Sequence, residues 1–155
     1  MTLRLKTWLL AAALLSAPLT ASATGGVDCR IDDRNLKLEF EAAFSYSDIG
    51  GMFQARGRLA PKQARTFKTL KKIELKDADV GQQWFRGDDL KLMLYRETEG
   101  DGVPHAFVKL IIETTKPPEE DFAYSGTSVL TVQPAVVKGD EEAVTVKGKV
   151  KCSAG

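Results

Sequence analysis

The sequence predicts an all-β protein, an antiparallel β-sandwich of about seven strands with at most one or two short helical turns. A closed β-barrel is the alternative, since both folds produce the same pattern. Apolar residues recur with a period of two over most of the chain, as expected for strands that bury one face. Clusters of glycine, proline and acidic residues separate these segments. No repeat or linker interrupts them, so residues 24–155 are predicted to form one domain.

Residues 1–23 have a different composition and are predicted to be a cleaved secretory signal peptide. A basic start at Arg4 and Lys6 precedes an uncharged apolar run over residues 8–15. Small residues then lead up to Ala23. The apolar run is shorter than the roughly 20 residues that a membrane-spanning helix needs. We therefore expect cleavage after Ala23, a mature protein without a membrane span, and a periplasmic or secreted location.

The charge and residue types of the chain exclude several function classes. Its 22 Lys+Arg stand against 21 Asp+Glu, so it lacks the basic surplus by which nucleic-acid binders displace phosphate counterions. The single histidine, His105, starts a predicted strand, and no Gly-x-Ser-x-Gly turn accompanies it. We therefore expect no nucleic-acid partner, no nucleophilic triad, no cofactor and no metal site.

The two cysteines lie near the two ends of the predicted domain. In an oxidising compartment, two cysteines in a small domain are more often bonded than free. A reactive thiol would need an activating base or a helix N-terminus, and the sequence shows neither beside Cys29 or Cys152. We predict a structural disulfide between Cys29 and Cys152 that ties the ends of the domain together.

The first predicted strand spans residues 36–46, where apolar and polar residues alternate. A glycine-containing turn at residues 47–51 leads into a second strand over residues 52–59, and the two strands form a hairpin. Residues 61–70 fit either a short helix that begins at a proline or a loop. Residues 72–76 fit a short strand.

Residues 79–85 are predicted to form one helical turn. Asp79 is a suitable N-cap for this turn, and Gly87 is a suitable residue to end it. The aromatic side chains of Trp84 and Phe85 are then expected to cover part of the core.

Four strands are predicted in the second half of the domain. Residues 90–95 and 106–113 form a central hairpin whose loop contains a Glu-Gly-Asp-Gly turn. Residues 124–133 and 143–152 form the last two strands, with an acidic turn between them.

The central hairpin provides the candidate binding surface because it is apolar on both faces. If one face packs in the core, the other presents Met93, Tyr95, Phe107 and Ile111. An apolar patch of this size on a small protein indicates contact with something else. The alternative is intramolecular, with the segment 61–85 folding over these side chains.

The outward residues of the last predicted strand form a basic stripe of Lys147, Lys149 and Lys151. Such a stripe can attract an anionic lipid, a polysaccharide or an acidic partner. Lysine on an edge strand also deters edge-to-edge aggregation. Because no aromatic residues interleave with these lysines, the sequence favours the edge-strand interpretation.

Four aspartates flank the predicted helical turn and are the acidic residues best placed to converge: Asp77, Asp79, Asp88 and Asp89. Convergence would suit calcium, which takes about six to eight oxygen ligands, or the carboxylate pair of a glycoside hydrolase. The spacing matches no EF-hand loop, so solvated turns are the favoured interpretation.

These patterns predict an exported, non-enzymatic binding or accessory module, such as an inhibitor or a protein-interaction protein. A carrier of a small apolar or lipidic ligand is the first alternative. A small hydrolase that uses the carboxylates between Asp77 and Asp89 is the second. The expected partner is accordingly a protein or a small apolar ligand.

Overall fold

The computed structural model describes residues 24–46, 51–135 and 141–155, and the predicted signal peptide lies outside these residues. Nine antiparallel strands form one continuous sheet in the order β4-β3-β2-β1-β9-β8-β7-β6-β5. The strands are β1 (Thr24–Asp32), β2 (Leu36–Ser45), β3 (Phe53–Pro61), β4 (Ile73–Leu75), β5 (Val80–Arg86), β6 (Asp89–Glu97), β7 (Phe107–Thr115), β8 (Ala123–Gln133) and β9 (Val144–Ala154). Within the described ranges the helical elements are two single 3-10 turns, η1 (Lys68–Leu70) and η2 (Asp77–Asp79). The all-β prediction is confirmed.

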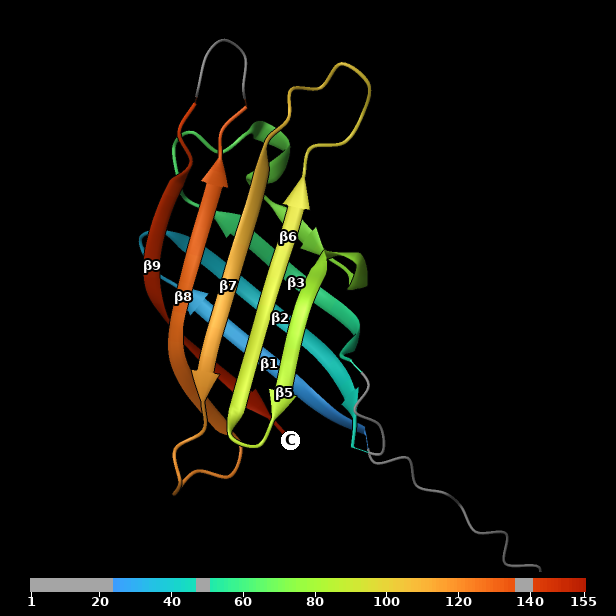
Figure 1. Ribbon diagram of the computed structural model, residues 1–155, viewed down its shortest axis with the longest axis vertical. Coiled ribbons are helices and arrows are strands. Elements are labelled where there is room, and N and C mark those ends of the chain that lie inside the picture. The colour runs from blue at the N-terminus through green and yellow to red at the C-terminus, as the bar shows by residue number, and fades with distance from the viewer. Residues whose placement is uncertain (1–23, 47–50, 136–140) are drawn as a thin grey trace, which may run out of the picture.

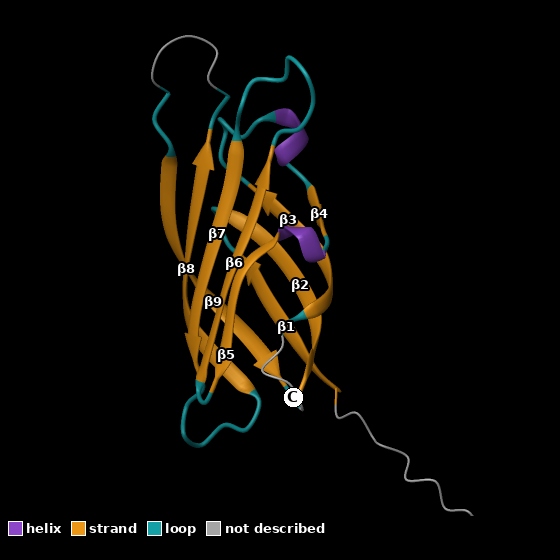
Figure 2. Cartoon of the chain, turned by 45° about the vertical axis from the view of Figure 1, so that its right-hand side comes forward, coloured by secondary structure: helices purple, strands orange, loops and turns teal. Residues whose placement is uncertain are grey.

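The sheet curls on itself, so that β1–β3 lie behind β5–β9 in Figure 1 and the two groups form facing layers. Figure 2 shows the same curl from the side, with η2 between the two layers. The outermost strands, β4 and β5, do not pair with each other, so the sheet is a curled half-barrel. The two layers expected of a sandwich are therefore two halves of a single sheet.

The core fills the concave side of this sheet. Alternate residues of each strand point into the space between the layers, as the pleat of a strand requires. Among the fully buried side chains are Leu38 and Phe40 from β2, Leu92 and Leu94 from β6, and Leu110 from β7. Because these residues come from both halves of the sheet, neither half can bury its apolar face without the other.

Two strands correct the sequence prediction. The first strand was predicted at residues 36–46, but residues 24–32 form an earlier strand, β1, which pairs with β2 along its whole length. β5 occupies the residues that were expected to form a helical turn. Gly87, with a φ of 60°, makes the tight turn that pairs β5 with β6, rather than ending a helix. The segment between β3 and β4 is mainly a loop that contains η1.

β1 and β9 join the two halves of the sheet through a short ladder. Only four residue pairs connect them, from Val27 with Ala154 to Arg30 with Lys151, whereas β1 and β2 share nine. Cys29 and Cys152 face each other within this ladder and form a disulfide. The predicted bond is thus confirmed, and it links residues 123 positions apart within the ladder that joins the two halves of the sheet.

Removing the disulfide should destabilise the protein strongly. The variant Cys29→Ala/Cys152→Ala lacks a cross-link that spans 123 residues, and the chain-entropy model gives about 4 to 5 kcal/mol for loops of that size. Urea unfolding followed by circular dichroism measures the loss, and fully reduced wild-type protein should show a similar one. An unfolding free energy within about 1 kcal/mol of the oxidised wild type would contradict this role.

Candidate functional site

The convex side of the curled sheet has two faces that differ in composition. Between the core positions of each strand, the side chains point outward. On β1–β4 these outward residues are mainly charged or small. On β6–β8 they include large apolar side chains. The outer face of β5–β9, which faces the viewer in Figure 1, is therefore the candidate binding surface.

The four residues of the predicted surface lie together on the outer face of β6 and β7. Met93 faces Ile111 across the ladder, and the rings of Tyr95 and Phe107 have centroids 5.6 Å apart. All four side chains are half-buried, and none belongs to the core. Val129 of β8 faces Ile111 from the other side and extends the row. We call these five residues the apolar patch.

The aromatic and apolar residues expected to fold over this surface lie elsewhere. Leu70 is buried in the core, and Phe67 and Phe85 pack against the core. Trp84 lies on the outward side of β5 beside Lys91 and is 52% exposed. These side chains therefore do not shield the apolar patch, and Trp84 adds an exposed aromatic ring beside it.

A groove of about 480 Å³ runs beside the apolar patch. Residues that line it include Gln82, Trp84, Lys91, Met93, Ile111 and Glu113. Gly81 leaves room for Met93, because a Cβ on Gly81 would stand 2.7 Å from Met93 Cε. The groove thus combines one aromatic ring, several apolar side chains and one charge of each sign. Trp84 was expected to cover part of the core beside Phe85, and this prediction is wrong for Trp84. Adjacent side chains of a strand point to opposite faces, so Phe85 points inward whereas Trp84 and Gln82 point outward.

Tyr95 is held in place at the edge of the apolar patch. Its hydroxyl donates a hydrogen bond of 2.8 Å to the Glu97 carboxylate. Partial burial of the ring raises the pKa of the Tyr95 phenol, and the bond to Glu97 raises this pKa further. The phenol therefore stays neutral at physiological pH and presents an apolar ring with one polar end.

The four aspartates do not converge on one site. Asp77 and Asp79 lie in η2 before β5, whereas Asp88 and Asp89 follow β5. The length of this strand separates the two pairs by roughly 20 Å. In the described part of the chain, no group of three or more His, Cys, Asp or Glu side chains is arranged to hold a metal ion. The calcium and hydrolase hypotheses therefore gain no support from this arrangement.

Asp77 and Asp79 instead connect β3 and β6, which belong to the two opposite ends of the sheet. Asp79 is almost fully buried and accepts two hydrogen bonds from the Arg96 guanidinium, at 2.5 and 2.6 Å. These bonds raise the pKa of Arg96 above its ordinary value. Asp77 accepts the backbone N–H of Ala55 at 2.6 Å. The two aspartates thus fix η2 between β3 and β6, which is a structural role.

The space between the layers is filled by the protein's own side chains. Phe40 and Leu110 are fully buried there together with a continuous apolar cluster from both halves of the sheet. A carrier of an apolar ligand would have to displace part of this cluster. The carrier hypothesis therefore stays a prediction without a supporting contact.

Within the described ranges, no helix has the length and apolar character needed to cross a bilayer. Comparison of the chain with protein-family models, with curated proteins and with solved structures gives no match. Function is therefore inferred from the surface itself.

Replacing Asp79 should lower stability far more than replacing an exposed aspartate. Asp79→Ala leaves the partly buried Arg96 guanidinium without its carboxylate, and breaking a buried pair in this way costs about 3 to 5 kcal/mol. Asp88→Ala is the control, since the pair of Asp88 with Lys116 is exposed and such pairs contribute at most about 1 kcal/mol. Urea unfolding of both variants measures the difference, and equal losses would exclude a structural role for Asp79.

Tyr95 should ionise at a higher pH than an ordinary tyrosine. Burial is the larger cause and the bond to Glu97 the second, so Glu97→Gln should lower the Tyr95 pKa while leaving it above normal. Because the folded-state pKa is raised, the stability that it contributes is present below about pH 10 and is lost as pH rises further. Carbon-13 NMR of labelled tyrosine measures this pKa. An ordinary value in the wild type would contradict the burial of the ring.

Proposed function

We propose that the protein is an exported, non-enzymatic binding module whose partner protein docks on the outer face of β5–β8. The observation that carries this proposal is the apolar patch, which joins three neighbouring strands outside the core. Trp84, 52% exposed, extends it toward β5. Large outward apolar areas of this kind on small proteins serve as contact surfaces.

The side chains of the patch suit a protein interface. Tyrosine and tryptophan are among the residues that contribute most to binding free energy when a partner covers them. Here Trp84, Tyr95 and Phe107 lie on the ladder of one rigid sheet. A partner would therefore meet aromatic rings that are already held in place, which reduces the entropy lost on binding.

The disulfide supports the exported part of the proposal. Bonded cysteines persist in non-reducing compartments, and they are rare in the cytosol. The Cys29–Cys152 bond is consistent with the secretory signal that the sequence predicts for residues 1–23.

The double variant Tyr95→Ser/Phe107→Ser should lose its partner while keeping its fold. Cross-linking in the native host, followed by mass spectrometry, provides candidate partners, and each is purified and titrated by calorimetry. Loss of two aromatic contacts at the centre of an interface should weaken binding at least tenfold, or about 1.4 kcal/mol. The unfolding free energy should fall by no more than about 1 to 2 kcal/mol, since both rings are already half-exposed.

Two control variants make this result interpretable. Lys37→Ser/Glu39→Ser removes an exposed ion pair from the opposite outer face and should leave binding unchanged. Leu94→Ser/Val108→Ser places polar groups in the core beside the same strands and should unfold the protein. Tight binding by the Tyr95/Phe107 variant, or a stability loss as large as that of the core variant, would reject the proposal.

A further inference from the structure

The basic stripe of Lys147, Lys149 and Lys151 lies on β9, which the strand order places between β1 and β8. The ladder of β9 with β1 covers only residues 151–154, so the described ladder partners of Lys147 and Lys149 belong to β8 alone. These two lysines therefore lie along an open edge, where lysine deters aggregation, as the sequence predicts. Edge protection does not account for Lys151, which pairs with Arg30 of β1. We call the three residues the lysine column.

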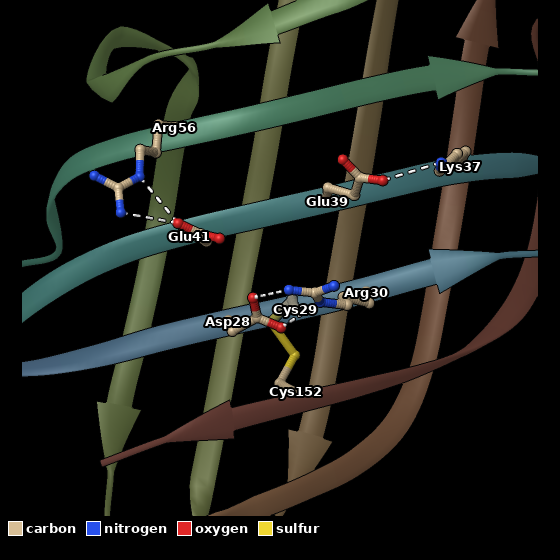
Figure 3. A network of polar contacts seen from close by, with 8 residues as sticks. All are labelled: Asp28, Cys29, Arg30, Lys37, Glu39, Glu41, Arg56 and Cys152. Carbon is tan, nitrogen blue, oxygen red and sulfur yellow. Dashed lines mark hydrogen bonds and ion pairs between the residues drawn. A yellow bond between two sulfur atoms is a disulfide. The ribbon is translucent and has the colours of Figure 1, made fainter.

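On the opposite outer face, the charged side chains pair with one another. Each cation on the strands β1–β4 lies within 3.0 Å of a neighbouring carboxylate, and so does Lys62 directly after β3. Five such ion pairs are present: Arg30–Asp28, Lys37–Glu39, Arg56–Glu41, Arg58–Glu74 and Lys62–Asp32. Figure 3 shows three of them on β1, β2 and β3. Lys37 also holds the pKa of Glu39 below its ordinary value. This face is thus internally neutralised.

The lysine column is not neutralised in this way. All three lysines are exposed, and none forms an ion pair with a carboxylate of any residue that the structure describes. A hollow of about 690 Å³ lies where β1 turns away from β9, beside Lys149 and Lys151. Asp28, Asp32 and Asp33 line it. The first two carboxylates bind Arg30 and Lys62, and the third accepts the backbone N–H groups of Asn35 and Leu36. Three unmatched positive charges therefore stand in a row.

This column is continuous with the apolar patch. Lys147 faces Val129 on β8, and Val129 faces Ile111 on β7. Two strand spacings place Lys147 about 10 Å from Ile111 on the same face. One surface therefore carries an apolar area with Lys109 inside it and the lysine column along one side, whereas the other outer face has paired charges.

We infer that the partner contacts this surface with an acidic protein segment, whose apolar side chains meet the patch and whose carboxylates meet the lysine column. The inference rests on the proposed function and names the chemistry of its partner. The column has a repeat of about 6.6 Å, two residues of a strand. Carboxylates on alternate residues of an extended segment have the same repeat. Electrostatic matching of this kind fixes register and speeds association.

A protein segment fits better than an anionic membrane. Glu97 and Glu113 lie on the same outer face, on β6 and β7, beside the apolar patch. Lys91 faces Glu113 across the ladder, and Lys109 lies between Phe107 and Ile111 on the same face, so cations and carboxylates alternate around the patch. A uniformly negative bilayer would be repelled by the two carboxylates. A protein can place neutral or basic groups opposite these two residues and acidic ones opposite the lysine column.

The probe for this inference is a random copolymer of glutamate and tyrosine, titrated into nitrogen-15-labelled protein and followed by NMR. Amide shifts should appear in β9 at residues 147–151 and in the apolar patch. Lys147→Gln/Lys149→Gln/Lys151→Gln should weaken binding about tenfold, since it removes all three cations that the carboxylates contact and each exposed ion pair contributes a small part. Raising the salt concentration should weaken wild-type binding in the same direction.

The matched control is Lys37→Gln/Arg56→Gln/Arg58→Gln, which removes the same number of cations from the opposite outer face and should change binding less than twofold. Equal losses in the two triple variants would overturn the inference, because net charge alone would then explain binding. Preferential binding of phosphatidylglycerol vesicles or of alginate, offered in parallel, would also overturn it and make a membrane or a polysaccharide the occupant. If only the Tyr95→Ser/Phe107→Ser variant loses the purified partner, the proposed function stands and the acidic chemistry is rejected.

Discussion

The short ladder between β1 and β9, with the Cys29–Cys152 bond across it, is the constraint on which the rest of the structure depends. A ladder of four residue pairs, together with reciprocal hydrogen bonds between Gly26 and Gly155, connects one half of the sheet to the other through the backbone. The core is nevertheless shared between the halves, so the apolar faces stay buried only while the two layers are held together. A covalent bond at this position reinforces the ladder that joins the two halves. The packing of Leu38 and Phe40 against the opposite layer depends on it.

The curl of the sheet also separates the surface into two chemical environments. On the outer side of β1–β4, ion pairs such as Arg56–Glu41 satisfy the charges within the molecule. On the outer side of β5–β9, half-buried rings and unpaired lysines occupy neighbouring strands. Exposed ion pairs stabilise a fold only slightly. Their main effect is on binding, because a charge that is already paired attracts a partner less. A face whose charges are matched offers little to a partner, and the other face offers both apolar area and charge.

Much of this architecture follows from local pattern, and the parts that do not follow are those set by distant contacts. The alternation from Leu90 to Tyr95 identified β6 and both of its faces, because the period of two is a property of the strand itself. β5 was mistaken for a helical turn because most of its residues are exposed, which removes the alternation. The Asp79–Arg96 pair and the central place of β9 escaped prediction for a related reason. Each depends on residues far apart in sequence that only the folded sheet brings together.

The pairing of β1 with β9 has a consequence for the order in which the sheet forms. The strands β5 to β9 follow one another as neighbours in a meander, and β1 to β3 do the same, so both groups close over short loops. The ladder between β1 and β9 joins the earliest and the latest strands of the domain, and loop closure over such a distance makes folding slow. During synthesis one edge of β1 therefore stays unpaired until β9 has been made. In that interval the nascent chain exposes an edge and an apolar face that other chains can bind, so a chaperone that covers β1 would act before the disulfide can form.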